Sequence, residues 1–200
     1  MEGGYKKVVQ LDDTLAAAAS GPKQGDVEVF VDWLQRVLCL KRMTSGGLTV
    51  SAAASLARRQ LAQDLRRRPM DVNMLLGGWD KVRGAQLYWL DGMGSLQPIP
   101  FGAHGAASSF VISVLDKGHR GDETELRDAV RLMRDCVAQL STRYLVRGGG
   151  FQMMVVDARG CRDIGCGECV LGGEGAGAQD GAAEEQQQQQ QRRHLSGVDR

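Results

Sequence analysis

One mostly apolar stretch, Val72-Asn73-Met74-Leu75-Leu76, constrains the fold of this chain more than any other feature. A strand with one buried face alternates apolar and polar residues, and this stretch shows no clean alternation. It therefore predicts a strand covered on both faces, which requires a layer of structure on each side of its sheet.

The neighbouring segments predict further strands. Three apolar runs over residues 71–79, 86–90 and 93–99 are typical of a β meander, and Asp91-Gly92 is a strong hairpin signal between the last two. Upstream, the runs 8–11 and 15–19 bracket Asp12-Asp13 and predict two short strands joined by a tight turn. A final strand is expected over residues 151–157, turned by Arg159-Gly160.

Two helices are expected between the first strands and the meander. Asp26 is the predicted N-cap of the first, and apolar residues from Val27 onward recur at helical spacing until Gly46-Gly47 stops them. The second is predicted to begin near Thr49 and to end before Pro69, which cannot continue a helix. Its alanines allow close approach to a neighbouring layer.

Two more helices are expected after the meander. One covers residues 104–115, and the other begins at Asp122 and Glu125, which have the spacing of a capping box, and ends at the glycines 148–150. The apolar stripe of this last helix is predicted to be its buried face and consists of Leu126, Val130, Met133, Val137, Leu140 and Tyr144.

This order of elements indicates an α+β fold in which the sheets lie in the middle and the helix pairs lie outside, a four-layer αββα sandwich. We assign this domain to residues 1–164. From residue 165 the composition shifts to glycine, alanine, glutamate and glutamine, including the glutamine run 186–191, with no aromatic residue. Such a segment buries too little apolar surface to offset its ordering entropy, so residues 165–200 are expected to be a disordered tail.

The overall composition excludes some classes of partner. A net charge of +1 gives no argument for nucleic acid or an anionic membrane, and no segment approaches the roughly 20 apolar residues that span a bilayer. The N-terminus has no apolar core of a signal peptide, so we expect an intracellular protein with its five cysteines reduced.

An ordered series of segments carries a family resemblance. It comprises residues 71–80, 86–91 and 114–116, the loop Pro100-Phe101-Gly102-Ala103-His104-Gly105, and residues 143–144 and 155–160, with 7–11 and 18–21 upstream. Over roughly residues 6–164 this series resembles the proteasome beta subunits, and most of all the non-catalytic beta type-2 class. The family normally has about two more strands before the equivalent of Lys7, so a sandwich shortened at its N-terminus is expected.

The resemblance implies an N-terminal nucleophile hydrolase fold, no cofactor and no metal. It implies a place among other alpha and beta subunits in a heteromeric complex of stacked rings, and a part in ubiquitin-dependent and general protein degradation. It also implies localisation in the cytoplasm and nucleus, with neither nucleic acid nor a membrane as partner.

The residues at the expected catalytic positions do not suit catalysis. Active members of the family use an N-terminal threonine freed after a glycine, and no Gly-Thr pair occurs in this chain. Tyr144 and Arg147 occupy the positions of an aspartate and a serine, and 104–107 replaces a glycine-serine-glycine motif. We therefore expect a non-catalytic subunit with no catalytic residue. Two alternatives remain: an active threonine peptidase whose start is misassigned, or a diverged paralogue that does not assemble.

Other candidate sites have two interpretations each. Cys161, Cys166 and Cys169 could bind zinc with His194 as a distant fourth ligand, or be ordinary reduced thiols, which the spacing favours. His104 has no evident nucleophile or acid partner, which favours a structural or interface role.

The remaining patterns also favour ordinary interpretations. A basic group at Arg58, Arg59 and residues 66–68 suggests a solvated helix face or a subunit contact more than nucleic acid. The glycines at 148–150 lack the pattern of a phosphate loop. Five methionines in apolar runs are expected to fill the core, not to bind a cofactor: Met74, Met93, Met133, Met153 and Met154.

Overall fold

The structure is a computed structural model that describes residues 6–121, 124–143 and 151–167. All of these residues lie in the first of the two units into which the chain divides, residues 1–169. Several expectations concern residues outside the described ranges: Asp122, Tyr144, Arg147, the glycines 148–150 and the tail from residue 168. None of the described helices combines the length and apolarity needed to cross a bilayer.

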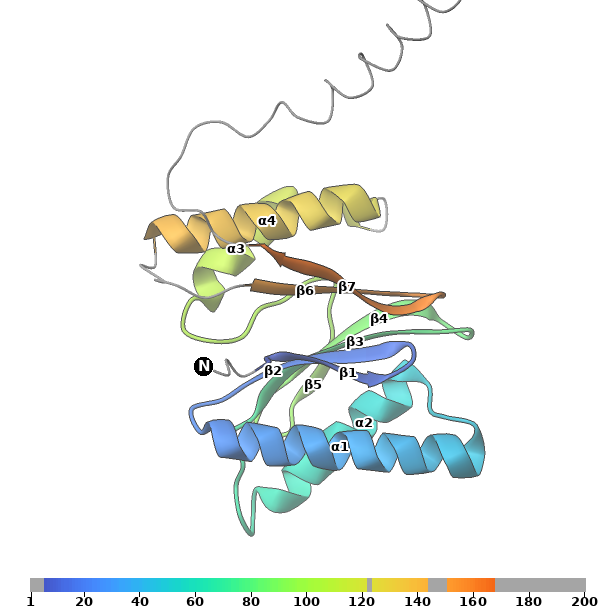
Figure 1. Ribbon diagram of the computed structural model, residues 1–200. Coiled ribbons are helices and arrows are strands. Elements are labelled where there is room, and N and C mark those ends of the chain that lie inside the picture. Colours follow the sequence, from blue (N-terminus) through green and yellow to red (C-terminus); the bar gives the residue numbers. More distant parts are fainter. Residues whose placement is uncertain (1–5, 122–123, 144–150, 168–200) are drawn as a thin grey trace, which may run out of the picture. The chain divides into compact units, whose positions relative to one another are not determined.

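A five-stranded antiparallel sheet is the larger of two sheets (Figure 1). It consists of β1 (Val8–Asp12), β2 (Leu15–Ser20), β3 (Asn73–Asp80), β4 (Gly84–Leu90) and β5 (Leu96–Pro98), in that spatial order. The predicted strand pair near the N-terminus and the predicted meander are both confirmed. The two groups join where β2 pairs with β3, with Ala17 opposite Leu76.

The central strand β3 has two different faces. Met74, Leu76 and Gly78 are buried, whereas Leu75 and Gly77 between them are only partly buried. Its residues on one face belong to the main core, and β3 also contacts the second sheet through β6 (Phe151–Asp157). The expectation of a layer of structure on each side of β3 is therefore confirmed, but only one face of this strand is tightly packed.

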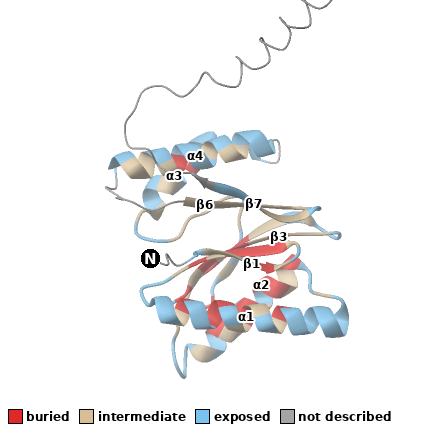
Figure 2. Ribbon diagram, in the orientation of Figure 1, coloured by how far each residue is buried: buried red, intermediate tan, exposed pale blue. Residues whose placement is uncertain are grey.

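Helices α1 (Gln24–Ser45) and α2 (Val50–Asp64) cover the tightly packed face, where the buried residues concentrate (Figure 2). The prediction of Asp26 as the N-cap of α1 is wrong: Lys23 occupies that position without a side-chain cap bond, and Asp26 lies in the first turn. Its carboxylate there still suits the positive end of the helix dipole. Helix α2 begins next to Thr49 as predicted, and Thr49 caps it, because its hydroxyl accepts a hydrogen bond from the Ala52 amide.

A second sheet contains β6 and β7 (Gly160–Gly167), which form an antiparallel pair. The apolar pattern predicts β6 as the final strand, but β7 follows it. The predicted tail therefore begins too early, because residues 165–167 belong to β7. The positive φ of Gly160 allows the turn between the two strands. Backbone pairing with β6 holds β7 in place, and the mixed polarity of β7 gives no periodicity that would predict it.

Helices α3 (Ser108–Gly118) and α4 (Leu126–Arg143) pack against each other, with Gly118 directly beneath the Leu132 side chain. Within the first unit, Figure 1 shows the layers in the order α1 and α2, the five-stranded sheet, β6 and β7, then α3 and α4, as the predicted αββα sandwich requires. The predicted buried stripe of α4 is wrong in part, since Leu126 and Met133 are 51% and 44% exposed.

Two adjacent glycines in β3 differ in the space around them. A Cβ atom on Gly78 would lie 2.7 Å from Leu15 Cδ1 and 2.8 Å from Val50 Cγ2, whereas one on Gly77 would meet only Leu87 Cδ1 at 3.6 Å. Gly78 therefore lets the start of α2 approach the sheet closely.

We predict that Gly78→Ala lowers the free energy of unfolding by about 1–3 kcal/mol, because the added methyl group overpacks this contact. The matched variant Gly77→Ala should be neutral or stabilising by up to about 1 kcal/mol, because its site is open and glycine weakens a strand. Urea unfolding of the two full-length variants compares them, and equal destabilisation would contradict the close approach.

Asp80 joins α2 to the β3–β4 turn. Its Oδ2 accepts hydrogen bonds from the Val50 amide (3.1 Å) and Gln86 Nε2 (2.7 Å), and its Oδ1 accepts from the amides of Val82 (2.9 Å) and Arg83 (2.8 Å). The bond from the Arg83 amide is the main cause of a lowered pKa for Asp80, and the other three act in the same direction against a partial burial that raises it.

A lowered pKa in the folded state means that this stabilisation is complete above the ordinary aspartate pKa of about 3.9 and is lost as the pH falls below it. We therefore expect Asp80→Ala to lower the melting temperature at pH 7, and to flatten the loss of stability between pH 5 and pH 3 compared with the unchanged chain. Thermal melts at several pH values measure both effects, and parallel profiles for the two proteins would refute this role.

Candidate functional site

His104 lies between β5 and α3 and contacts two other strands. Its Nε2 is 3.2 Å from the Met74 carbonyl oxygen, to which it donates because a carbonyl can only accept, and its ring stacks on Trp89 with centroids 4.8 Å apart. Burial lowers the pKa of His104, an effect that the Met74 bond and the Asp91 charge partly offset. The structural role expected for this residue agrees with these contacts.

The same contacts correct the predicted helix over residues 104–115. The segment 104–107 is irregular, and α3 begins only at Ser108. The Met74 and Trp89 contacts hold His104 against β3 and β4, outside the helix. This is a tertiary effect that helical periodicity cannot reveal.

The cysteines proposed as zinc ligands are only partly described. Cys161 is half-buried, its Sγ lies 3.7 Å from the Asp12 carbonyl oxygen, and burial raises the pKa of its thiol. The side chain of Cys166 and all of Cys169 and His194 lie outside the described residues. No three metal-binding side chains gather among the residues that the structure describes, so the zinc hypothesis remains untested.

The basic group on and after α2 does not act as one surface. Arg58 Nε donates a hydrogen bond to the Gly94 carbonyl oxygen (3.0 Å) and so ties α2 to the β4–β5 turn. Arg68 lies at the outer limit of an ion pair with Asp26, at 4.0 Å. Of the methionines, Met74 fills the core as predicted, but Met93 is 72% exposed.

The β1–β2 turn is a junction that the sequence pattern does not reveal. Arg42, near the end of α1, places NH1 2.8 Å from Asp12 Oδ1 and 3.1 Å from Asp13 Oδ1. On the other side, the Cys161 amide donates to the Asp13 carbonyl oxygen, and the Trp79 amide donates to that of Thr14, both at 2.9 Å. Only the fold brings these distant segments together.

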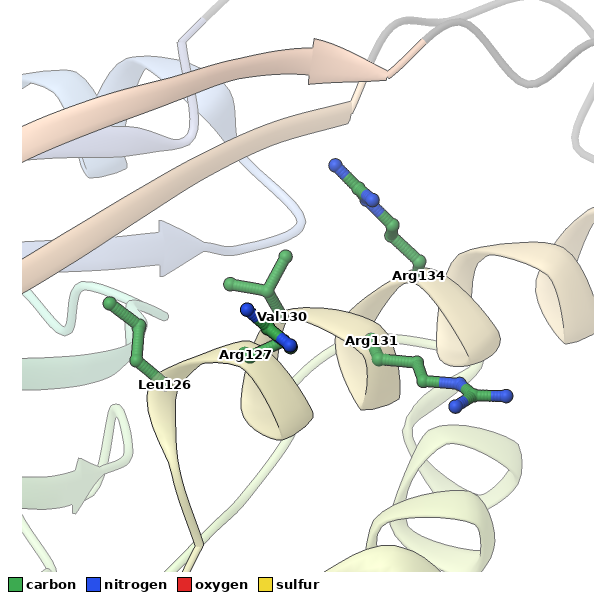
Figure 3. Close-up of a pocket in the computed structure, with 5 residues that line it drawn as sticks. All are labelled: Leu126, Arg127, Val130, Arg131 and Arg134. Atoms are coloured by element: carbon green, nitrogen blue, oxygen red, sulfur yellow. The ribbon is translucent and has the colours of Figure 1, made fainter. Parts of the chain in front are cut away.

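A groove on α4 is lined by Leu126, Arg127, Val130, Arg131 and Arg134 and encloses about 590 Å³ (Figure 3). We call it the α4 groove. The apolar periodicity of this helix does not identify Arg127, Arg131 and Arg134, although their i, i+4, i+7 spacing is itself a signal of a shared helix face.

Residues 1–156 match the family described as proteasome subunit. The chain is 34% identical over 160 residues to "Proteasome subunit beta type-2-B" of Arabidopsis thaliana, covering 80% of the chain and 79% of the relative. It is 34% identical over 152 residues to "Proteasome subunit beta type-2" of Dictyostelium discoideum, covering 74% and 76%.

A third relative is also a proteasome beta subunit. The chain is 37% identical over 161 residues to "Probable proteasome subunit beta type-4" of Neurospora crassa, covering 79% of the chain and 78% of the relative. The resemblance seen in the sequence and the N-terminal nucleophile hydrolase fold that it implies are thereby confirmed. The chain therefore belongs to the proteasome subunit family, and among its members it is similar to the beta type-2 subunits.

Proposed function

We propose that this beta subunit is a non-catalytic, structural component of the proteasome core particle. The observation that carries the proposal is the loop that begins at His104, where active members carry a glycine-serine-glycine motif. Here the histidine ring is committed to Met74 and Trp89, so the loop serves packing. Tyr144 and Arg147, at the positions of a catalytic aspartate and serine, support the same conclusion from the sequence.

Exposed apolar side chains support a role in assembly. On α1, Val29 and Leu40 are exposed and Met43 is 79% exposed, and Leu126 and Met133 are exposed on α4. Apolar surface of this kind is often buried by partner subunits. We propose that other alpha and beta subunits of a heteromeric stacked-ring complex cover it, and that the chain holds its catalytic neighbours in register.

In this role the chain would contribute to ubiquitin-dependent and general protein degradation in the cytoplasm and nucleus. It would need no cofactor, metal, nucleic acid or membrane. Two rival assignments are an active threonine peptidase with a misassigned start and a paralogue that does not assemble. The first differs from the proposed function in activity and the second in partners, so two measurements distinguish all three.

We expect the purified full-length chain to hydrolyse fluorogenic peptides no faster than the buffer blank, because it lacks a suitable nucleophile, while assembled proteasome as the control is active. We also expect the tagged chain, isolated from its own cells, to carry other proteasome subunits in native mass spectrometry. Hydrolysis that a threonine-directed inhibitor abolishes would establish the peptidase, and isolation of the inactive chain alone would establish the paralogue.

The structural role of His104 can be tested separately. Because its pKa is lowered in the folded state, its stabilising contribution is complete above the ordinary histidine pKa of about 6.5 and is lost as the pH falls. His104→Phe keeps an aromatic ring against Trp89 but cannot titrate, so its melting temperature should fall less between pH 7.5 and pH 5.5 than that of the unchanged chain. His104→Ala should be less stable than both at pH 7.5, and an equal pH response in all three proteins would refute this role.

A further inference from the structure

The outer edges of the two sheets are not equally protected. A free strand edge exposes unpaired backbone N–H and C=O groups, and proteins usually block it. On β1, Gln35 Nε2 donates a hydrogen bond to the Gln10 carbonyl oxygen (2.8 Å). On β5, Pro98 has no N–H to offer, and on β7 the Cys161 amide donates to the Asp13 carbonyl oxygen (2.9 Å). Among the described residues, none blocks the edge of β6 that faces away from β7 in any of these ways.

The register of the small sheet identifies the backbone groups on this edge. Val156 pairs with Cys161, and the Cys161 amide points away from β6 because it binds Asp13. Antiparallel pairs alternate, so the backbone groups of Val156 also point outward, and so do those of Met154, which pairs with Asp163 two residues earlier. The N–H and C=O groups of Met154 and Val156 therefore lie along the free edge, and no other described residue forms a hydrogen bond with them.

The side chains of β6 are those of an inner strand. Residues 153–156 form a continuous apolar run, which is typical of a strand covered on both faces within a sheet. Yet each of its seven residues is only partly buried, whereas Met74 and Leu76 of the central strand β3 are completely buried (Figure 2). A sheet of two strands is also marginally stable by itself. Within the described residues, β6 thus combines the sequence of an inner strand with the position of an edge strand.

The large sheet extends beyond the small one on the side of this edge. Strand β7 packs on β2, and β6 packs on β1, β2 and β3, so a strand added beside β6 would lie toward β4. On the face of β4 opposite Tyr88 and Leu90 of the main core, Leu87 is only partly buried. Gly77 lies beside it, and a Cβ atom there would meet only Leu87 Cδ1. An added strand would therefore cover apolar surface of the large sheet as well as extend the backbone ladder.

We propose that the free edge of β6 binds an extended, apolar segment of another polypeptide, which joins the small sheet as a third strand. The backbone groups of Met154 and Val156 form the new hydrogen bonds, as in other cases of strand addition. The segment carries apolar side chains on both faces, because it lies between the five-stranded sheet and the layer of α3 and α4 (Figure 1). The inference goes beyond the proposed function, in which partner subunits cover outer faces, and it holds whether or not the chain is catalytic.

The position of the edge between two layers favours a single strand over a second copy of this chain. On the side of the edge the large sheet continues through β4 and β5, which is about 10 Å at the usual strand spacing. A second copy that presented its own β6 would bring the same overhang. The two large sheets would then collide before the two β6 edges came within hydrogen-bonding distance.

The test uses the full-length chain and a fluorescein-labelled peptide of about nine residues, with alternating valine and isoleucine in its core and lysines at both ends for solubility. Fluorescence anisotropy should show that it binds. The same peptide with N-methyl groups on two adjacent core residues cannot pair fully along either of its edges. It should bind at least about tenfold more weakly, because it loses main-chain hydrogen bonds.

Two proline variants locate the site. Met154→Pro removes an outward N–H without taking a bond from the β6–β7 ladder, and it should weaken binding at least about tenfold. The matched control is Val8→Pro on the outer edge of β1. Because the Ala19 amide binds the Lys7 carbonyl oxygen, the backbone of the next residue, Val8, points outward, and this variant should weaken binding less than about twofold.

Hydrogen exchange measured by NMR on the unchanged chain gives a result that does not depend on the folding of a variant. The amides of Met154 and Val156 should exchange at least about tenfold more slowly with saturating peptide. Absence of binding, equal binding of the N-methylated peptide, or equal losses in the two proline variants would overturn the proposal. Slow exchange of both amides without peptide would show that another segment of this chain covers the edge. A dimer that Met154→Pro dissociates would assign the edge to a second copy, and either result would also overturn the proposal.

Discussion

The close packing of α2 on the five-stranded sheet is the contact on which the rest of the structure depends. Ala53 and Ala57 are completely buried, and Gly78 leaves room for Val50 at the start of the helix. Small residues on both surfaces bring the layers close together, and the large side chains of α1 pack in the same core alongside. Asp80 then fixes the position of the helix along the sheet, because it binds the first turn of α2 and the β3–β4 turn at once.

Much of this fold follows from local sequence signals. The strands β1 to β5, the start of α2 near Thr49 and the end of α1 at Gly46 come from turn chemistry and periodicity, which act over a few residues. Strand β7 was missed for a local reason, because its mixed polarity gives no periodicity although it pairs with the adjacent strand β6. The late start of α3 depends instead on distant residues, through the contacts of His104 with β3 and β4. The stripe of α4 was misjudged because apolar periodicity cannot distinguish a core from an exposed interface.

The features of the candidate site are likewise in part predictable from the sequence and in part visible only in the structure. The family resemblance predicts which residues stand at the catalytic positions, but only the structure shows how His104 is used, through a carbonyl on β3 and a ring on β4. The α4 arginines were visible in the sequence as a spacing, yet their lack of acidic partners among the described residues is a property of the fold.

The β1–β2 turn has a consequence for how the layers come apart. Arg42 of α1 holds the turn from one side, while backbone bonds from Trp79 and Cys161 hold it from the other. A fluctuation that opened these few bonds would release the helix layer, the large sheet and the small sheet from a common anchor. The turn thus links three layers that are distant in sequence, and its opening would remove one contact from each of them at once.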